Sequence, residues 1–219
     1  MGTSERRQRE KENLRRAILE AARELFVDHG FDNVSMRKIA ERIEYSPTTI
    51  YLHFKDKEEI FATLVEEGFT LLSERLEPFH IRVADPIERL REGAKAYFGF
   101  AREQPHFYRI MFDMKSVVMT ESAWEEIRDN AHYRAGVRAF GFIVRCVHEG
   151  IAQGKIPHGD ASEANILLLS HVVWSSLHGV VSLVLADRLL KMPCDLPETA
   201  ARLLLDATID NTLRGLTGK

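Results

Sequence analysis

Residues 45–60 read YSPTTIYLHFKDKEEI, and these sixteen residues contain two helix starts. Ser46 stands directly before Pro47, an arrangement typical of a helix N-cap followed by the first helical residue. Asp56, with Glu59 three residues later, forms a capping box that starts another helix. Only about two turns of helix fit between these two starts. A helix this short is not stable alone in water, so it must pack against neighbouring helices.

The preceding residues predict those neighbours. Apolar residues recur at helical spacing, which predicts a helix over residues 11–29. Ser35 is the N-cap of a second helix that is expected to end near Ile43. We expect the short third helix to dock against these two helices through Ile50 and Phe54.

The rest of the chain also has helical periodicity, without strand-like alternation. Asp85 and Pro86 start one helix, Pro105 interrupts the pattern, and longer helices follow to the end. The predicted fold class is all-α: a three-helix helix-turn-helix DNA-binding domain followed by a helical ligand-binding and dimerisation domain. The predicted divisions are a disordered N-terminal arm over residues 1–10, the helix-turn-helix domain over 11–57 and the helical domain over 58–219.

Composition favours a cytoplasmic protein. The net charge is −3, with +2 over residues 1–57 and −5 over the remainder, so a basic excess alone is weak evidence for a nucleic-acid partner. The two cysteines form no Cys-x-x-Cys motif, which argues against a disulfide scaffold or a thiolate metal site. The charged N-terminus lacks the apolar core of a signal peptide.

One segment is long enough to span a membrane, because no charged residue occurs from Ala164 to Ala186. Its polar residues, however, recur at steps of four, three and four, which places them in one stripe of a helix. This pattern favours a buried helix that lines a cavity or a subunit contact, so no membrane association is predicted. His171 and His178 lie roughly 10.5 Å apart along such a helix, too far to bind one metal ion.

The helix-turn-helix plan gives the short third helix a function, because in this plan the second of two short helices enters the major groove of DNA. Hydroxyl groups at the start of that helix can bind base edges, and the residues further along suit flanking phosphates. The alternative is that these residues are ordinary caps and surface polar groups. The predicted DNA-binding residues are Ser35, Arg37, Lys38, Tyr45, Ser46, Pro47, Thr48, Thr49, Tyr51, His53 and Lys57.

Residues 14–61 resemble the DNA-binding domain of the TetR family of bacterial transcription regulators. The most specific match is Ser46-x-x-x-Ile50-Tyr51-x-His53-Phe54-x-x-Lys57. In addition, Trp174-x-x-x-His178-Gly179 is similar to the signature of one C-terminal subgroup of the family. The other matching residues are Ile18-Leu19-x-Ala21-Ala22 with Leu25-Phe26, Gly30-Phe31 and Ser35-Met36-x-x-Ile39-Ala40.

The resemblance implies a homodimer that binds a near-palindromic operator and holds a small molecule in its C-terminal domain. Most members of the family repress transcription and release DNA when the ligand binds. It also implies that Thr48 and Thr49 read bases while Tyr51, His53 and Lys57 hold phosphates. The chain departs from the family at Glu44, where glycine is usual. A left-handed turn residue there would strain a glutamate and place an acid near DNA.

Bulky apolar residues are concentrated in residues 97–124 and suggest a pocket for a small hydrophobic or aromatic effector. The alternative is that each of these residues packs in the hydrophobic core and lines no pocket. No cofactor is predicted. The predicted ligand-binding residues are Tyr97, Phe107, Met111, Phe112, Trp124, Trp174 and His178.

The charge-free segment and the last helix are expected to form a four-helix dimer interface, or else to fill the monomer core. The last helix carries an apolar stripe for either role, formed by Leu205, Ile209, Leu213 and Leu216. Motifs of metalloproteases, serine hydrolases and phosphate-binding loops are absent, so an enzyme is not predicted. A helical small-molecule-binding protein with weak or lost DNA binding remains the alternative function, and a membrane-tethered regulator ranks below it.

Overall fold

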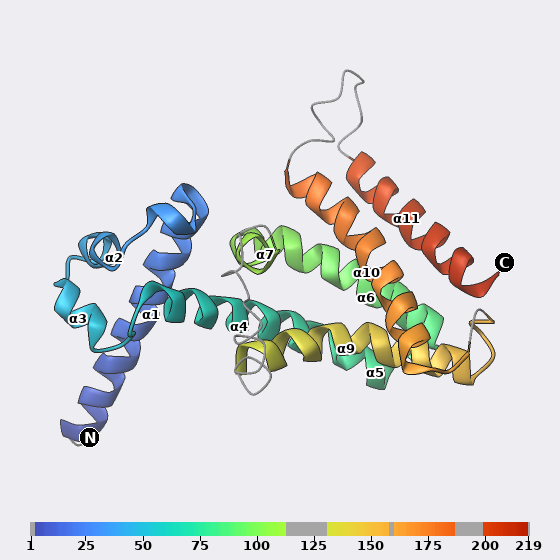
Figure 1. The fold of residues 1–219 in the computed structure, drawn as a ribbon, viewed down its shortest axis with the longest axis horizontal. Coiled ribbons are helices and arrows are strands. Elements are labelled where there is room, and N and C mark those ends of the chain that lie inside the picture. Colours follow the sequence, from blue (N-terminus) through green and yellow to red (C-terminus); the bar gives the residue numbers. More distant parts are fainter. Residues whose placement is uncertain (1–2, 113–130, 158–159, 187–198, 219) are drawn as a thin grey trace. The chain divides into compact units, whose positions relative to one another are not determined.

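The computed structural model describes residues 3–112, 131–157, 160–186 and 199–218, and within these ranges every regular element is a helix (Figure 1). The all-α prediction is therefore confirmed. The chain forms two compact units, which are described separately below. The first contains residues 1–69 and 106–135, and the second contains residues 70–105 and 136–219.

The first unit begins with α1 (Thr3–His29), which is longer than the sequence predicted. Residues 1–10 were expected to be a disordered arm, but the helix is already formed at Thr3. Arg6 forms an ion pair with Glu10 at 2.8 Å, and Gln8 donates a hydrogen bond to Glu12 at 2.7 Å. Such pairs, one turn apart, stabilise the exposed N-terminal part of α1.

Three N-caps define the helices that follow. After the short 3-10 helix η1 (Phe31–Asn33), Ser35 starts α2 (Met36–Arg42) by accepting a hydrogen bond from the Lys38 amide at 3.3 Å. Ser46 caps α3 (Pro47–Tyr51) and Asp56 caps α4 (Lys57–Leu76) in the same way. The predicted caps are confirmed, although α3 ends at Tyr51 and is shorter than expected.

The docking of α3 is also confirmed, because Ile50 is fully buried and Phe54 is 1% exposed. The Arg15 guanidinium of α1 lies 4.0 Å from the centre of the Phe54 ring and donates a hydrogen bond to the His53 carbonyl at 3.0 Å. Arg42 and Glu24 join α2 to α1 through an ion pair of 2.8 Å. Long-range contacts to α1 thus fix a helix that could not persist alone.

Among the described residues, five helices lie wholly or mainly in the second unit beyond the end of α4: α5 (Pro78–Arg82), α6 (Pro86–Glu103), α9 (Ala131–Ala152), α10 (Glu163–Leu185) and α11 (Ala200–Thr217). The short α5 was not predicted. Asp85 caps α6 as expected, since its carboxylate accepts the amide hydrogens of Ile87 and Glu88. α10 and α11 pack along each other, and both contact α6.

A buried arginine holds three parts of this unit together. Arg89 of α6 is 4% exposed and donates to Glu149 of α9 at 2.7 Å and to the Val83 carbonyl at 2.9 Å. The same guanidinium contacts His80 of α5 at 2.9 Å. Burial lowers the pKa of His80, and the nearby charges of Arg145 and Arg89 lower it further. A neutral imidazole is consistent with this crowded cationic site.

The apolar stripe of α11 belongs to the core of this unit. Its four residues are at most 5% exposed in a single chain: Leu205, Ile209, Leu213 and Leu216. The core alternative therefore accounts for this stripe. α10 has the length and hydropathy of a membrane span, a property shared by core helices of soluble proteins.

Candidate nucleic-acid interface

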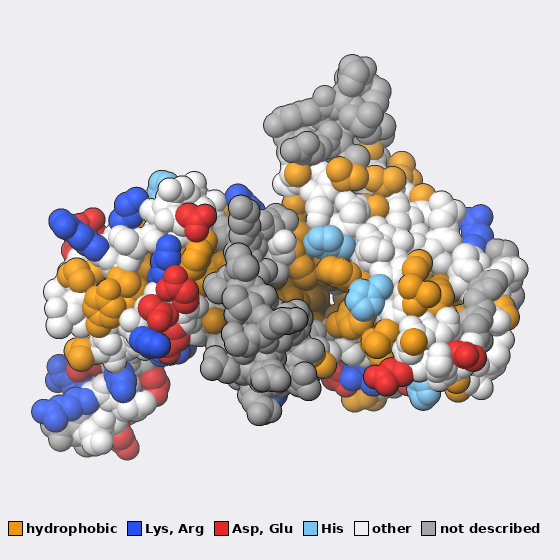
Figure 2. Space-filling model, in the orientation of Figure 1, with side chains coloured by type: hydrophobic (Ala, Val, Ile, Leu, Met, Phe, Trp, Pro, Cys, Tyr) orange, Lys and Arg blue, Asp and Glu red, His pale blue; other side chains and the backbone are white. Residues whose placement is uncertain are grey.

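The exposed side of α3 is formed by Pro47, Thr48, Tyr51 and Leu52, which we call the recognition face. By helical periodicity these residues cover less than half of the helix circumference, and the anchors Ile50 and Phe54 lie outside this arc. Tyr51 is 56% exposed and Leu52 is 75% exposed. Figure 2 shows hydrophobic side chains at the surface over α2 and α3, with Lys and Arg side chains nearby.

The two threonines of α3 differ in their freedom to bind a partner. Thr49 is half-buried, and its hydroxyl lies 2.9 Å from the Ser46 hydroxyl, which also caps the helix. Thr48 is exposed, and its hydroxyl makes no hydrogen bond within the described part of the chain. Thr48 is thus the more available of the two predicted base-reading residues.

His53 is half-buried beside α1. Its Nδ1 atom is buried without a hydrogen-bond partner among the described residues. Burial lowers the pKa of His53, and the positive charges of Lys11 and Arg15 lower it further. A neutral ring with its proton on Nε2 avoids burying an unpaired N–H group at Nδ1. Such a ring can donate one hydrogen bond from Nε2.

Lys57 has a structural role that the sequence did not reveal. Its ammonium donates hydrogen bonds to the carbonyls of Phe31 at 3.0 Å and Val34 at 3.2 Å, and it lies 4.3 Å from the centre of the Phe31 ring. Two of its three N–H groups are therefore used inside the unit. Its phosphate contact stays a prediction. The exposed Lys55, two residues earlier, was not among the predicted contacts, and its side chain makes no ion pair or hydrogen bond among the described residues.

The remaining predicted basic residues of this region already have local partners. Arg37 forms an exposed ion pair with Glu41 at 2.8 Å, and Lys38 donates to the Asn33 carbonyl at 2.7 Å. Tyr45 is 50% exposed. These side chains would have to exchange weak surface contacts for DNA contacts, which costs little free energy at exposed positions.

Glu44 adopts the left-handed conformation expected at the turn, with φ of 59°. It follows α2 as part of a C-terminal cap in which the Tyr45 amide donates to the Ala40 carbonyl at 3.0 Å. This geometry favours glycine, and glutamate adopts it at a cost of about 1 kcal/mol. The strain predicted at Glu44 is thus present in the structure, and its carboxylate is on an exposed residue.

Three of the predicted ligand-binding residues come together in the second unit. The Tyr97 hydroxyl of α6 lies 3.0 Å from Nδ1 of His178 on α10. The Trp174 and His178 rings lie 5.1 Å apart between centres, and the Ser182 hydroxyl is 3.4 Å from Nε2 of His178. The group combines aromatic surface with polar atoms that can bind a ligand.

Three other predicted ligand residues lie in α7 (Pro105–Phe112) of the first unit. Phe107 and Met111 are buried and pack against Gly68 of α4, where an added Cβ would come within 2.6 Å of the Met111 sulfur. Phe112 contacts Phe69 with ring centres 5.5 Å apart. These contacts are also those of an ordinary core, and the ligand-binding role of the three residues stays a prediction. Trp124 lies outside the described residues.

The short capped helix, its exposed recognition face and its supporting helix define a helix-turn-helix DNA-binding protein. A family model described as bacterial regulatory proteins, tetR family, matches residues 18–64. A second, the tetracyclin repressor-like C-terminal domain, matches residues 90–208. The chain therefore belongs to the tetR family, as a transcription regulator with a ligand-binding C-terminal domain. These matches do not confirm the narrower Trp-x-x-x-His-Gly subgroup.

Solved structures extend the likeness over nearly the whole chain. A protein of unknown function from Rhodococcus sp. RHA1 is 26% identical, with 93% of this chain and 95% of that chain covered and a TM-score of 0.70. A putative fatty acid metabolism regulator from Clostridium perfringens is 25% identical, with 91% and 97% covered and a TM-score of 0.69. The TetR family transcriptional regulator PfmR from Thermus thermophilus is 25% identical, with 91% and 98% covered and a TM-score of 0.63.

Proposed function

We propose that this protein is a cytoplasmic, ligand-responsive repressor that binds a near-palindromic operator as a homodimer and releases it when a small apolar or aromatic effector binds. The observation that carries the proposal is the recognition face of α3. It is exposed, mixed in polarity and held in place by the buried anchors Ile50 and Phe54. A rigid helix with an exposed face of this size suits the major groove of DNA.

Within this proposal the side chains divide into two classes. Thr48 reads bases, with Thr49 and Pro47 beside it, and a thymine methyl group is a suitable partner for the apolar part of this face. Tyr51, His53 and Lys57 hold phosphates, the last through its remaining N–H group. The other predicted contacts flank the groove: Ser35, Arg37, Lys38, Tyr45 and Ser46.

The homodimer is supported by an exposed apolar face on α10. Leu168 is 62% exposed, Val172 46% and Leu183 44%, and no charged residue interrupts this helix from Ala164 to Ala186. Leu203 of the neighbouring α11 is 62% exposed. Figure 2 shows hydrophobic side chains at the surface over α10. A second copy of the same face would cover them symmetrically.

The effector site is supported by the Tyr97, Trp174 and His178 group. Stacking against Trp174 and a hydrogen bond from Tyr97 or His178 would suit an aromatic ligand with one polar group. Such a ligand would have to separate the 3.0 Å contact between Tyr97 and His178 or bind beside it.

The direct experiment is an electrophoretic shift and footprint on DNA that flanks the protein's own gene. We expect a protected near-palindrome, and the absence of any protection at low salt would refute the proposal that this protein regulates transcription.

Replacing Tyr51 and His53 by alanine should weaken binding to all DNA sequences alike. It should also reduce the slope of log affinity against log salt by about 0.9 per lost phosphate contact. Thr48→Ala should instead change the preference among operator variants.

The dimer is tested by Leu168→Glu, which should convert a dimer into a monomer in sedimentation experiments. Ile81→Glu is the matched control, because Ile81 is 89% exposed on α5 and lies outside the proposed interface. A monomeric wild-type protein, or equal masses for both variants, would contradict the interface.

A helical small-molecule-binding protein with lost DNA binding is the second candidate function. It is favoured by the exposed acid Glu44 at the turn before α3. If this candidate is correct, effectors will stabilise the protein thermally while no DNA sequence is protected. Restoration of DNA binding by Glu44→Gly would then identify the cause.

A further inference from the structure

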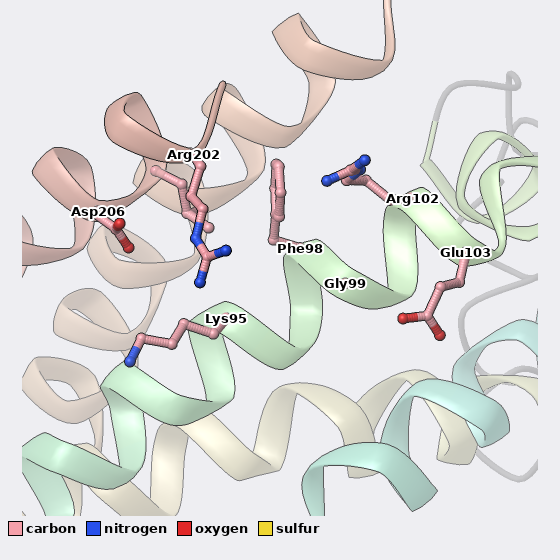
Figure 3. A pocket seen from close by; sticks show the side chains of 8 residues that line it. Lys95, Phe98, Gly99, Arg102, Glu103, Arg202 and Asp206 are labelled. Carbon is pink, nitrogen blue, oxygen red and sulfur yellow. The ribbon is translucent and has the colours of Figure 1, made fainter. Parts of the chain in front are cut away.

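A groove of about 490 Å³ opens between α6 and α11 in the second unit (Figure 3). Lys95, Phe98 and Arg102 project from α6, while Arg202 and Asp206 project from α11 into the same space. Its volume lies in the range of small-molecule sites. The residues that line it are Lys95, Phe98, Gly99, Arg102, Glu103, Arg202, Leu205 and Asp206.

The inner wall of this groove is apolar. Phe98 is 7% exposed and Leu205 is 3% exposed, so both side chains are packed in the core and only a narrow part of each borders the groove. In Figure 3 the Phe98 ring stands between the side chains of Arg102 and Arg202. An aliphatic or aromatic body could lie against this ring without any rearrangement of the core.

Three cationic side chains surround this apolar wall. Lys95 is paired with Glu92 at 2.7 Å, and the Arg102 guanidinium lies 5.9 Å from the centre of the Phe98 ring. The side chain of Arg202 makes no hydrogen bond or ion pair with any described residue. Two guanidinium groups thus line the groove without an acidic partner in the described part of the chain.

The acidic residues of the groove do not neutralise these cations. Glu103 is held by two hydrogen bonds from Arg75, at 2.6 and 2.8 Å, and this pairing lowers the pKa of the Glu103 carboxyl group. The Glu103 carboxylate is therefore paired with an arginine that does not line the groove. Asp206 is the one remaining acid among the lining residues, whereas two guanidinium groups, those of Arg102 and Arg202, have no acidic partner in the described part of the chain.

We propose that this groove binds an amphipathic anion, with its carboxylate or phosphate head group held by Arg102 and Arg202 and its apolar body against Phe98 and Leu205. Guanidinium groups bind both head groups through paired hydrogen bonds. The site is separate from the proposed effector site, because Tyr97 reaches His178 on α10 whereas Phe98 lines the groove toward α11. The proposal does not depend on DNA binding.

Isothermal titration calorimetry with decanoate, decyl phosphate and decan-1-ol tests the site. Both anions should bind the full-length protein, and the double variant Arg102→Gln with Arg202→Gln should weaken them by about tenfold or more. Binding of decan-1-ol should not change between the two proteins. Stronger binding of one anion identifies the preferred head group.

Arg214→Gln is the matched control, because it removes the same charge from an exposed position of α11 outside the groove. Arg202→Lys keeps the charge but removes the paired hydrogen bonds, so its affinity for decanoate should lie between that of wild type and that of Arg202→Gln. Unfolding temperatures equal to wild type will show that the variants fold. Undetectable binding of both anions to wild type, or equal affinity in the double variant, would overturn the proposal. Loss of decanoate binding in His178→Ala alone would assign decanoate to the effector site instead.

Discussion

The region around α3 and the centre of the second unit are stabilised by contacts of different range. Around α3 the hydrogen bonds that start each helix join residues three apart in sequence, as in Ser46 with Thr49 and Asp56 with Glu59. The end of α3 is held in addition by Arg15 of α1, whose partner is the His53 carbonyl 38 residues away. In the second unit the pairs Arg89 with Glu149 and Tyr97 with His178 are 60 and 81 residues apart. Short-range caps define where a helix starts, whereas long-range pairs define which helices meet. The two regions should therefore respond differently to mutation.

The largest effect is expected at Arg89. Arg89→Met leaves Glu149 and the Val83 carbonyl without their donor, so the free energy of unfolding should fall by about 3 kcal/mol in urea titrations. Arg91→Met is the matched control on the same helix, because the ion pair of Arg91 with Asp210 is more exposed. Its loss should lower the free energy of unfolding by less than about 1 kcal/mol. Equal losses of unfolding free energy in the two variants would mean that the buried contacts of Arg89 stabilise the fold no more than an exposed ion pair does.

A smaller loss is expected at Lys57. Lys57→Met keeps an aliphatic stem but leaves the carbonyls of Phe31 and Val34 without their charged donor, which should cost about 1.5 kcal/mol of unfolding free energy. Lys55→Met should leave stability unchanged, because the exposed Lys55 side chain makes no such bonds among the described residues. If Lys55→Met lowers the salt dependence of DNA binding more than Lys57→Met does, Lys55 is the main phosphate contact.

A gain in stability is expected from a substitution at Glu44, in the turn between α2 and α3. Glu44→Gly should raise the free energy of unfolding by about 0.5 kcal/mol, since relief of the left-handed strain exceeds the added chain entropy of glycine. Glu44→Gln keeps the strain and removes the charge, so it should change DNA affinity and not stability. A destabilised Glu44→Gly variant would show that the carboxylate makes a contact that outweighs the strain.

The smallest effect concerns the cap of α6 and depends on pH. A hydrogen bond from Lys155 lowers the pKa of Asp85, so the ionised carboxylate stabilises the folded state above its ordinary pKa. This stabilisation is lost as the pH falls through the lowered pKa. At pH 7 Asp85→Asn should cost less than about 1 kcal/mol, and the difference should shrink below a pH of about 4. In a Lys155→Met background the cost of the substitution should become smaller but not vanish, because the amides of Ile87 and Glu88 also lower the pKa of Asp85.

Much of the region around α3 could be predicted because its signals are local. Ser35, Ser46 and Asp56 cap helices as expected, and the strain at Glu44 follows from one unusual residue at a turn. The inward position of Lys57 could not be predicted, because the carbonyls that it binds belong to a segment more than 20 residues earlier. The same holds for Phe107 and Met111, whose burial depends on their packing against Gly68 of α4.

Local sequence patterns specify that this protein is helical, where most of its helices begin and which short helix carries the recognition face. These properties depend on caps, periodicity and backbone preferences within a few residues. Other properties depend on how the helices pack. Packing buries the stripe of α11 in the core, leaves an apolar face of α10 exposed and forms a cationic groove between α6 and α11. Whether an apolar or charged side chain is buried depends on contacts with helices that are distant in the chain. Its burial therefore cannot be predicted from the neighbouring residues in the sequence.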